Sequence, residues 1–337
     1  MSEITARPYR KDYEITDAMF GAFRSPGGMG LFWRLLGWTT LLYTVLYVLV
    51  LPSIVRGYVN MFAGIGDLDP TDVEAAEAVS DQINSAMLDM LPSLLVLMIG
   101  SIVILAVVRA AFYRSYFHNE TVRGFPFRLG ADEGRQLLAQ TGYWGLLLVF
   151  YILFAIVVGL VAALIGFGVG ASGGDGVGGM VLLGLIVVLA YIGIFVLLAW
   201  YLVRFAPAAA LTGLRRKTHV FAARHVSKNR FWALFGALLV ALIFGYVASY
   251  AAMLMGGMIG ASGLVDGNLL EQLMGDDASS VIESVGAKTQ TTSFRIKAFI
   301  GTVLLCLGTA FYTLMIMGPS AFFVRQWDEM DPSRAFD

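Results

Sequence analysis

Cysteine, histidine and charge are all scarce in this sequence of 337 residues. The single cysteine, Cys306, excludes an intramolecular disulfide and any metal site built from several thiolates. Only 14% of the residues are charged, where soluble domains carry about a quarter. The net charge of −1 gives no electrostatic reason to expect binding to nucleic acid. With 58% hydrophobic residues and a mean hydropathy of +0.75, the composition predicts that much of the chain lies in lipid.

Six apolar runs are each long enough to cross about 30 Å of hydrocarbon as a helix. Backbone groups in lipid must be paired within their own segment, so these runs are expected to be helical. We therefore predict an all-α integral membrane protein whose six-span membrane domain covers residues 31–325. A cytoplasmic leader with an amphipathic helix (1–30) precedes it, and a cytoplasmic tail (326–337) follows it. The predicted spans are residues 32–54, 91–113, 143–167, 180–205, 231–257 and 297–320.

Lysine and arginine are divided unequally between the two ends of these spans. Nineteen fall in the leader, the tail and the two connections that share their side, whereas four fall on the other side. Because an excess of these residues marks the cytoplasmic side, we expect both termini in the cytoplasm. The predicted location is the inner (plasma) membrane of a bacterial cell, crossed several times.

An aromatic phrase opens every second predicted span. It reads FWRLLG from residue 32 and FWALFG from residue 231, with a looser copy, YWGLLL, from residue 143. An aromatic pair at such a junction suits the water–lipid interface, so we predict Trp33, Trp144 and Trp232 as interface anchors. Each phrase follows a polar, partly basic segment and precedes two spans. We therefore predict three degenerate helical hairpins with cytoplasmic interfacial amphipathic helices.

The connection 204–230 contains seven cations and no acid. We expect Thr218 to cap an amphipathic helix there, with cations on its wet side. Cations in that position attract anionic lipid headgroups by about 1 kcal/mol each, although the same excess is also the ordinary positive-inside signal. The predicted headgroup-binding residues are Arg215, Arg216, Lys217, Arg224, Lys228 and Arg230.

An acidic helix is predicted on the opposite side, over Asp69–Met90. It starts at Asp69-Pro70-Thr71-Asp72, a sequence typical of a helix N-terminus, and reaches Pro92, where the second span begins. Its apolar face needs a cover, either the membrane surface, the third outer loop or a partner protein. We therefore predict a partner-protein site at Asp69–Met90.

No residue pattern typical of catalysis or of a cofactor is present. Gly168, Gly170 and Gly173 match a dinucleotide fingerprint as a string, but they follow a predicted membrane helix instead of a strand, which favours a flexible turn. The three histidines lack the spacing of a zinc site. No ionisable residue lies deep in a predicted span, which argues against ion-coupled transport and intramembrane proteolysis. We therefore predict a protein that is not an enzyme and holds no cofactor or metal.

Two weaker patterns concern contacts between helices. Hydroxyl residues of the first and sixth spans, such as Tyr43 and Thr313, are candidates for interhelical hydrogen bonds, with packing favoured over a polar substrate path. Gly256 and Gly260 form a G-x-x-x-G pattern that would let two helices approach closely.

Three segments resemble a known set of bacterial multi-pass proteins. They are Arg204–Ala210, His225–Gly236 and Phe127–Glu133, and the set is related to the membrane domain attached to some glycerophosphodiester phosphodiesterases. The resemblance implies a multi-pass membrane module. This sequence contains no counterpart of the catalytic barrel and no cluster of Glu, Asp and His, so the resemblance implies no phosphodiesterase activity and no catalytic residue.

Two functions from different classes remain open on the sequence. The first is a non-enzymatic inner-membrane protein that organises lipid, through anionic headgroups, or a partner protein. The alternative is a transport component for an uncharged or lipid-like substrate. A polar stripe along a central cavity would favour transport, and a closed apolar bundle would favour the first function.

Overall fold

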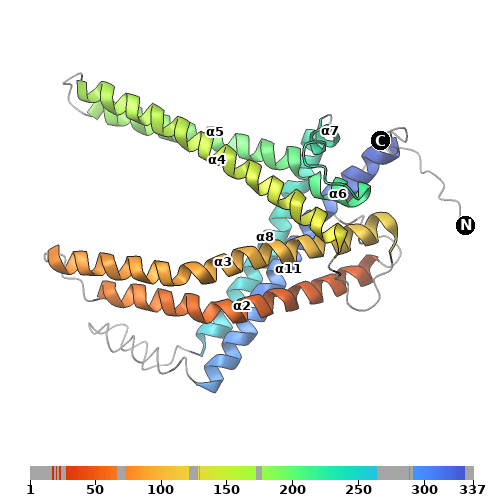
Figure 1. Cartoon of the computed structure of the whole chain (residues 1–337), viewed down its shortest axis with the longest axis horizontal. Helices are drawn as coiled ribbons and strands as arrows, with labels where there is room; N and C mark the ends of the chain where they lie inside the picture. Colours follow the sequence, from red (N-terminus) through yellow and green to blue (C-terminus); the bar gives the residue numbers. More distant parts are fainter. Residues whose placement is uncertain are drawn as a thin grey trace, which may run out of the picture.

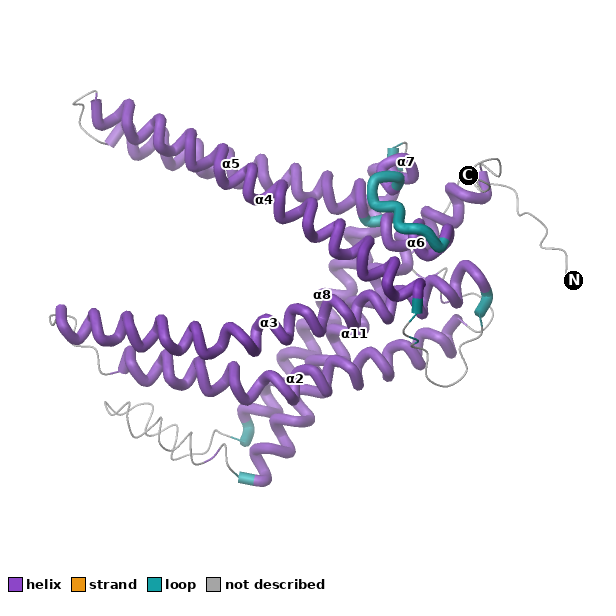
Figure 2. The backbone as a smooth tube through the Cα atoms, in the orientation of Figure 1, coloured by secondary structure: helices purple, strands orange, loops and turns teal. Residues whose placement is uncertain are grey.

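The computed structural model describes residues 28–66, 73–120, 130–171, 177–228, 230–263 and 291–330, with residues 17, 18, 20, 23, 128 and 288. Helix is the only regular element in these parts of the chain (Figure 2). Six of the helices are long and apolar enough to cross a membrane, which confirms the predicted all-helical fold with six spans. The helices are α2 Gly28–Gly66, α3 Val73–His118, α4 Ala131–Ala171, α5 Val177–Phe205, α6 Ala208–Arg215, α7 Ala223–Ser227, α8 Phe231–Ala261 and α11 Thr292–Met330.

Neighbouring long helices pack alongside each other, α2 with α3, α4 with α5 and α8 with α11. The three pairs meet at one end of the molecule and diverge toward the other (Figure 1). We call the meeting point the basic end; it holds the starts of α2, α4 and α8, the ends of α3, α5 and α11, and the short helices α6 and α7. The α4–α5 pair projects from this end as a separate arm, while α8 and α11 cross the α2–α3 pair.

The short helix α6 lies at the centre of the basic end, because it contacts one helix of each pair, namely α3, α4 and α11. Pro207 ends α5 by leaving its backbone without an N–H, and the chain turns directly into α6. The first turn of α6 is made of alanines and is buried. Small side chains permit this close fit: a Cβ at Gly213 would lie 2.5 Å from the Cβ of Tyr113 on α3.

The hydrophobic core gathers at the basic end. Its fully buried members come from α2, α3, α6, α8 and α11 and include Leu35, Val108, Leu211, Ala241 and Leu314. The arm contrasts with this core, since no side chain in the most apolar stretch of α4 is buried inside the protein. An apolar surface of that extent is stable only where lipid or protein covers it.

The structure corrects the predicted boundary at Pro92. We expected one helix to end there and a span to begin, but α3 continues through Pro92 as a single helix. The proline removes one hydrogen bond, and packing against α2 on the outer side of the proline, where Ala86 and Met90 are buried, holds the helix together. Residues 69–72, where the acidic helix was predicted to start, lie outside the described residues.

The predicted amphipathic segments also differ from expectation. Thr218 caps no helix, because α7 begins at Ala223 and has only five residues. The backbone N–H of His219 instead donates to the Thr212 hydroxyl at 3.2 Å, which holds the chain in a loop. In the leader, Phe23 is buried against the Phe32 ring, with the centroids 4.7 Å apart, so this part of the leader covers protein rather than lipid.

The predicted close approach at Gly256 is confirmed, whereas Gly260 has open space where a Cβ would stand. A Cβ at Gly256 would lie 2.5 Å from the Gly301 carbonyl oxygen of α11. We expect Gly256→Ala to lower the free energy of unfolding by about 1–3 kcal/mol, because helix backbone cannot give way like a flexible side chain. Thermal unfolding in detergent measures this, with Gly257→Ala, which meets nothing within 4 Å, as the control. Equal losses in both variants would contradict the packing argument.

Candidate functional site

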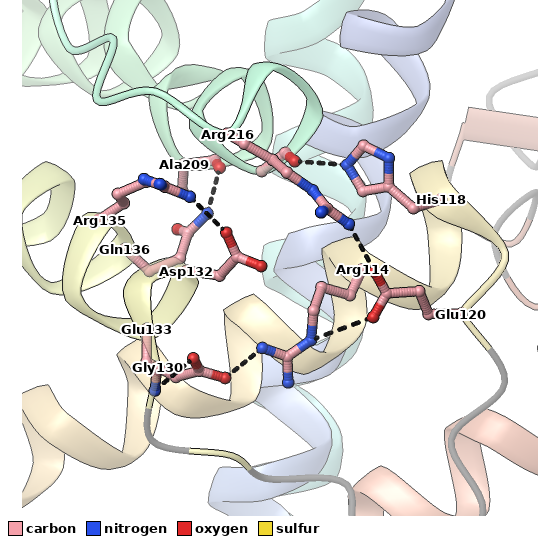
Figure 3. Close-up of polar contacts among 11 residues, drawn as sticks. Arg114, His118, Glu120, Gly130, Asp132, Glu133, Arg135, Gln136, Ala209 and Arg216 are labelled. Carbon is pink, nitrogen blue, oxygen red and sulfur yellow. Dashed lines mark hydrogen bonds and ion pairs between the residues drawn. The ribbon is translucent and has the colours of Figure 1, made fainter.

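A buried ion pair joins α3 to α4 at the basic end. Arg114, near the end of α3, donates to the carboxylate of Glu133 in the first turn of α4 (Figure 3). Their side chains are only 9% and 6% exposed. Glu133 also accepts the backbone N–H of Gly130 at 3.1 Å, which satisfies a free donor at the helix start. Asp132 and Glu133 both lie in the first turn of α4, where carboxylates suit a helix N-terminus, and Glu133 also joins this helix to α3.

A second contact extends this pair to α6. Glu120 lies 4.0 Å from Arg114 and also forms an ion pair with Arg216, just after α6 (Figure 3). Asn119 and Arg216 both have positive φ angles, of 49° and 50°, in the left-handed region that non-glycine residues rarely adopt. These two turns end α3 and bring the chain after α6 beside it, so the carboxylate and the guanidinium meet.

Two further hydrogen bonds hold α6 from either side. The side-chain amide of Gln136 on α4 donates to the Ala209 carbonyl at 2.8 Å. On the other side, Nε2 of His118 on α3 donates to the Gly213 carbonyl at 3.0 Å. Both acceptors belong to α6, so its backbone is fixed to the two neighbouring pairs by polar contacts as well as by packing.

The six predicted headgroup-binding residues fall into two groups. Three are engaged by the protein: Arg215 stacks over Trp327 at 5.1 Å, Arg216 pairs with Glu120, and Arg230 donates to Gln326 at 3.2 Å. The other three, Lys217, Arg224 and Lys228, are exposed. Exposed aromatic rings stand in the same segment, at Phe221 and Trp232. We call these five exposed residues the basic rim.

The three predicted interface anchors share one geometry. Trp33, Trp144 and Trp232 are 63%, 48% and 77% exposed, respectively. Each indole packs edge-on against the aromatic ring just before it, with centroids 5.5, 5.7 and 5.3 Å apart. The preceding ring is more enclosed than the tryptophan in each case. Each aromatic pair therefore points one ring inward and one outward at the basic end.

One of the predicted contacts between hydroxyl residues of α2 and α11 forms, because Tyr43 is hydrogen-bonded to the Thr313 side chain. Thr40, Thr309 and Thr313 each donate to the carbonyl one turn earlier in their own helix. The Thr39 hydroxyl is buried without a hydrogen-bond partner. The contacts that form lie within a helix or between two packed helices, which favours packing over a substrate path.

Histidine and acidic residues of the described segments form no group of three that could hold a metal ion. His219 lies in the loop between α6 and α7. Burial, and then the nearby Arg215 and Lys217, lowers the pKa of its imidazole below the ordinary value. Neutral His219 therefore adds no charge to the basic rim at neutral pH.

Sequence reasoning missed the ion pair and the existence of α6. The only local signals were the acids in the first turn of α4 and the proline at position 207. Neither indicates that Arg114 would lie opposite Glu133, because that depends on how α3 and α4 pack.

Comparison with protein-family models, with curated proteins and with solved structures finds no match to this chain. The class of protein follows from the helices themselves. Six long apolar helices, one of them with its most apolar stretch wholly unburied, make this a multi-pass membrane protein.

We expect Arg114→Met to lower the free energy of unfolding by about 3–5 kcal/mol, because it leaves the Glu133 carboxylate buried without its cation. The double variant R114M/E133M should recover most of the loss, since no buried charge remains. Thermal unfolding in detergent measures both. The control is E329Q, which breaks an exposed 3.0 Å pair with Arg325 while leaving that guanidinium over Tyr116, and should cost under about 1 kcal/mol. A double variant no more stable than R114M would contradict the role of the pair.

Proposed function

We propose that this chain is a non-enzymatic protein of the bacterial inner membrane that organises anionic lipid at its basic end, with both termini in the cytoplasm. The observation that carries the proposal is the basic rim. Three exposed cations, Lys217, Arg224 and Lys228, lie in one short segment with exposed Phe221 and Trp232. Cations attract phosphate groups while aromatic rings insert at the interface, so this combination fits a headgroup surface.

The neighbouring acids support this assignment. Glu120 and Glu133 are both taken by arginines of the basic end, namely Arg216 and Arg114. The connection 204–230, which contains the three rim cations, has no acidic residue of its own. Their charge is available to a ligand outside the protein. Arg215, Arg216 and Arg230 serve the fold first, which narrows the proposed headgroup contacts to Lys217, Arg224 and Lys228.

The matching aromatic pairs support a common membrane level for the basic end. Three outward tryptophans, near the starts of α2 and α8 and about a third of the way along α4, suit one interface. The pairing of α2 with α3, α4 with α5 and α8 with α11 is compatible with the three-hairpin plan that we propose. A role at lipid headgroups also fits the resemblance to membrane domains of glycerophosphodiester phosphodiesterases, which remains a proposal.

A partner-protein site is proposed at the far ends of α2 and α3. The 46 residues of α3 span about 69 Å at about 1.5 Å per residue, more than twice the hydrocarbon thickness of about 30 Å. The part before Pro92 carries exposed Met87 and Leu88 beside exposed Asp81 and Asp89. An apolar strip with acidic borders outside the lipid fits a protein partner.

We expect the triple variant K217Q/R224Q/K228Q to bind phosphatidylglycerol on the order of a hundredfold more weakly, since each cation contributes about 1 kcal/mol. Native mass spectrometry of protein released gently from its own membrane counts the retained lipids. The control, R56Q/R295Q/K297Q, removes the same charge from two separate helices at the other end. Unchanged lipid retention in K217Q/R224Q/K228Q would contradict the proposed binding of headgroups. Release of another polypeptide together with this protein, in a fixed ratio, would indicate that this protein is a subunit of a complex.

We expect a cysteine at Ser80 to react with an impermeant thiol reagent in intact cells, and one at Lys217 only after lysis. Both positions are exposed, at opposite ends of the protein. Each would be placed in a C306A background, whose native thiol is buried. The reverse labelling pattern would invert the proposed orientation.

A further inference from the structure

Arg109 is a cation without a matching acid in the part of α3 that enters the bundle. It lies one helical turn before Tyr113, which faces Gly213 of α6. Its Nε is buried and makes no hydrogen bond, and Arg109 forms no ion pair with any described residue. Arg109 is half-buried, and a guanidinium whose Nε is buried without a hydrogen bond is costly unless something compensates it.

Hydroxyl groups from several helices surround this guanidinium. Tyr43 of α2, Tyr113 of α3 and Tyr143 of α4 all lie within electrostatic range of Arg109. Tyr312 of α11 lies in turn near Tyr143. The charge therefore lies near tyrosine hydroxyl groups, which can donate to an anion, and forms no ion pair with a carboxylate of the described segments.

Two buried amides of α4 lie at the same level. Arg114 pairs with Glu133 on the antiparallel helix, and Arg109 stands about 7.5 Å further along α3 at about 1.5 Å per residue. The same rise places Gln136 and Gln140 about 4.5 and 10.5 Å beyond Glu133, on either side of that level. Each side chain is only 2% exposed, and each has a side-chain oxygen without a hydrogen-bond partner. These oxygens accept hydrogen bonds and cannot donate to an anion, so the two amides make this level of the bundle polar without themselves binding phosphate.

The position of this cluster is open to lipid. Tyr143 directly precedes Trp144, a proposed interface anchor, so the cluster lies near headgroup level. From here the α4–α5 arm diverges from α3 (Figure 1). Outward of the cluster, α3 exposes Ile99 and Val103, and α4 exposes Leu148 and Ile152. Acyl chains can lie along these apolar faces.

We propose that Arg109 and Tyr143 bind the phosphate of one phospholipid held where the arm meets the bundle. Arginine can bind phosphate through two parallel hydrogen bonds. The tyrosine hydroxyl supplies a further donor, while the acyl chains occupy the divergence between α3 and α4. The inference rests on the proposed lipid-organising function, and it names a single buried site distinct from the basic rim.

The test uses the full-length protein purified in mild detergent from its own membrane, with bound phospholipid counted by native mass spectrometry. We expect the wild type to keep one phospholipid through a delipidating wash and R109Q to bind it about a hundredfold more weakly. Y143F removes only a hydroxyl and should weaken binding about tenfold, without moving the midpoint of thermal unfolding. R109K, which keeps the charge but not the two-pronged grip, should fall between the wild type and R109Q.

Solvent extraction after denaturation identifies the source of the phosphate. Phosphorus in the organic phase that depends on Arg109 supports the phospholipid. Phosphorus in the aqueous phase would keep the phosphate site but overturn its lipid source. Wild-type retention in both R109Q and Y143F would overturn the site. The rim variant K217Q/R224Q/K228Q should keep this one lipid while losing others. If it loses none and R109Q still loses one, the proposed function of the rim fails and the Arg109 site stands.

Discussion

The packing of α6 against one helix of each pair is the constraint on which the basic end depends. Without α6, the α4–α5 arm would touch the rest of the chain mainly through α3, α7 and α8. The alanines of its first turn bring backbone close to backbone, and Gln136 and His118 then fix its carbonyls. Packing supplies the attraction and the hydrogen bonds fix the orientation, because a buried carbonyl without a donor costs free energy.

The packing of α6 also determines which cations of the basic end contact the protein and which are exposed. Arginines beside α6 turn toward acids or rings of the protein: Arg114 and Arg216 toward glutamates, and Arg215 toward Trp327. The cations further along the loop and α7 face outward. One basic segment therefore contains both cations that hold the fold together and cations that are exposed. A count of its lysines and arginines does not distinguish the two groups. The positive-inside rule predicts on which side of a membrane cations lie, but it does not predict which of them form contacts within the fold.

The sequence predicts the six long helices because their cause is local. A run of about 20 apolar residues has no alternative to helix in lipid, and the aromatic phrase marks where such a run begins. Features that depend on contacts between helices are not predictable from such local patterns. Whether Pro92 breaks α3 depends on α2 packing beside it, and the pairing of Arg114 with Glu133 depends on the register between two helices. The amphipathic pattern after Thr218 was read as a helix, but a hydrogen bond to Thr212 holds that stretch in a loop.

The arm shows why lipid must be treated as part of this structure. Its most apolar stretch has no buried side chain, so the chain itself supplies almost none of the covering that such a surface requires. Among the described residues, the hydrogen bonds and ion pairs that join the arm to the rest of the chain lie at the basic end, at Glu133 and Gln136 of α4 and at Arg204 of α5. The arm is therefore held at one end, and along the rest of its length it needs a cover that the chain does not supply. The lipid proposed between α3 and α4 would lie beside the contacts that hold α4 to α3 and to α6.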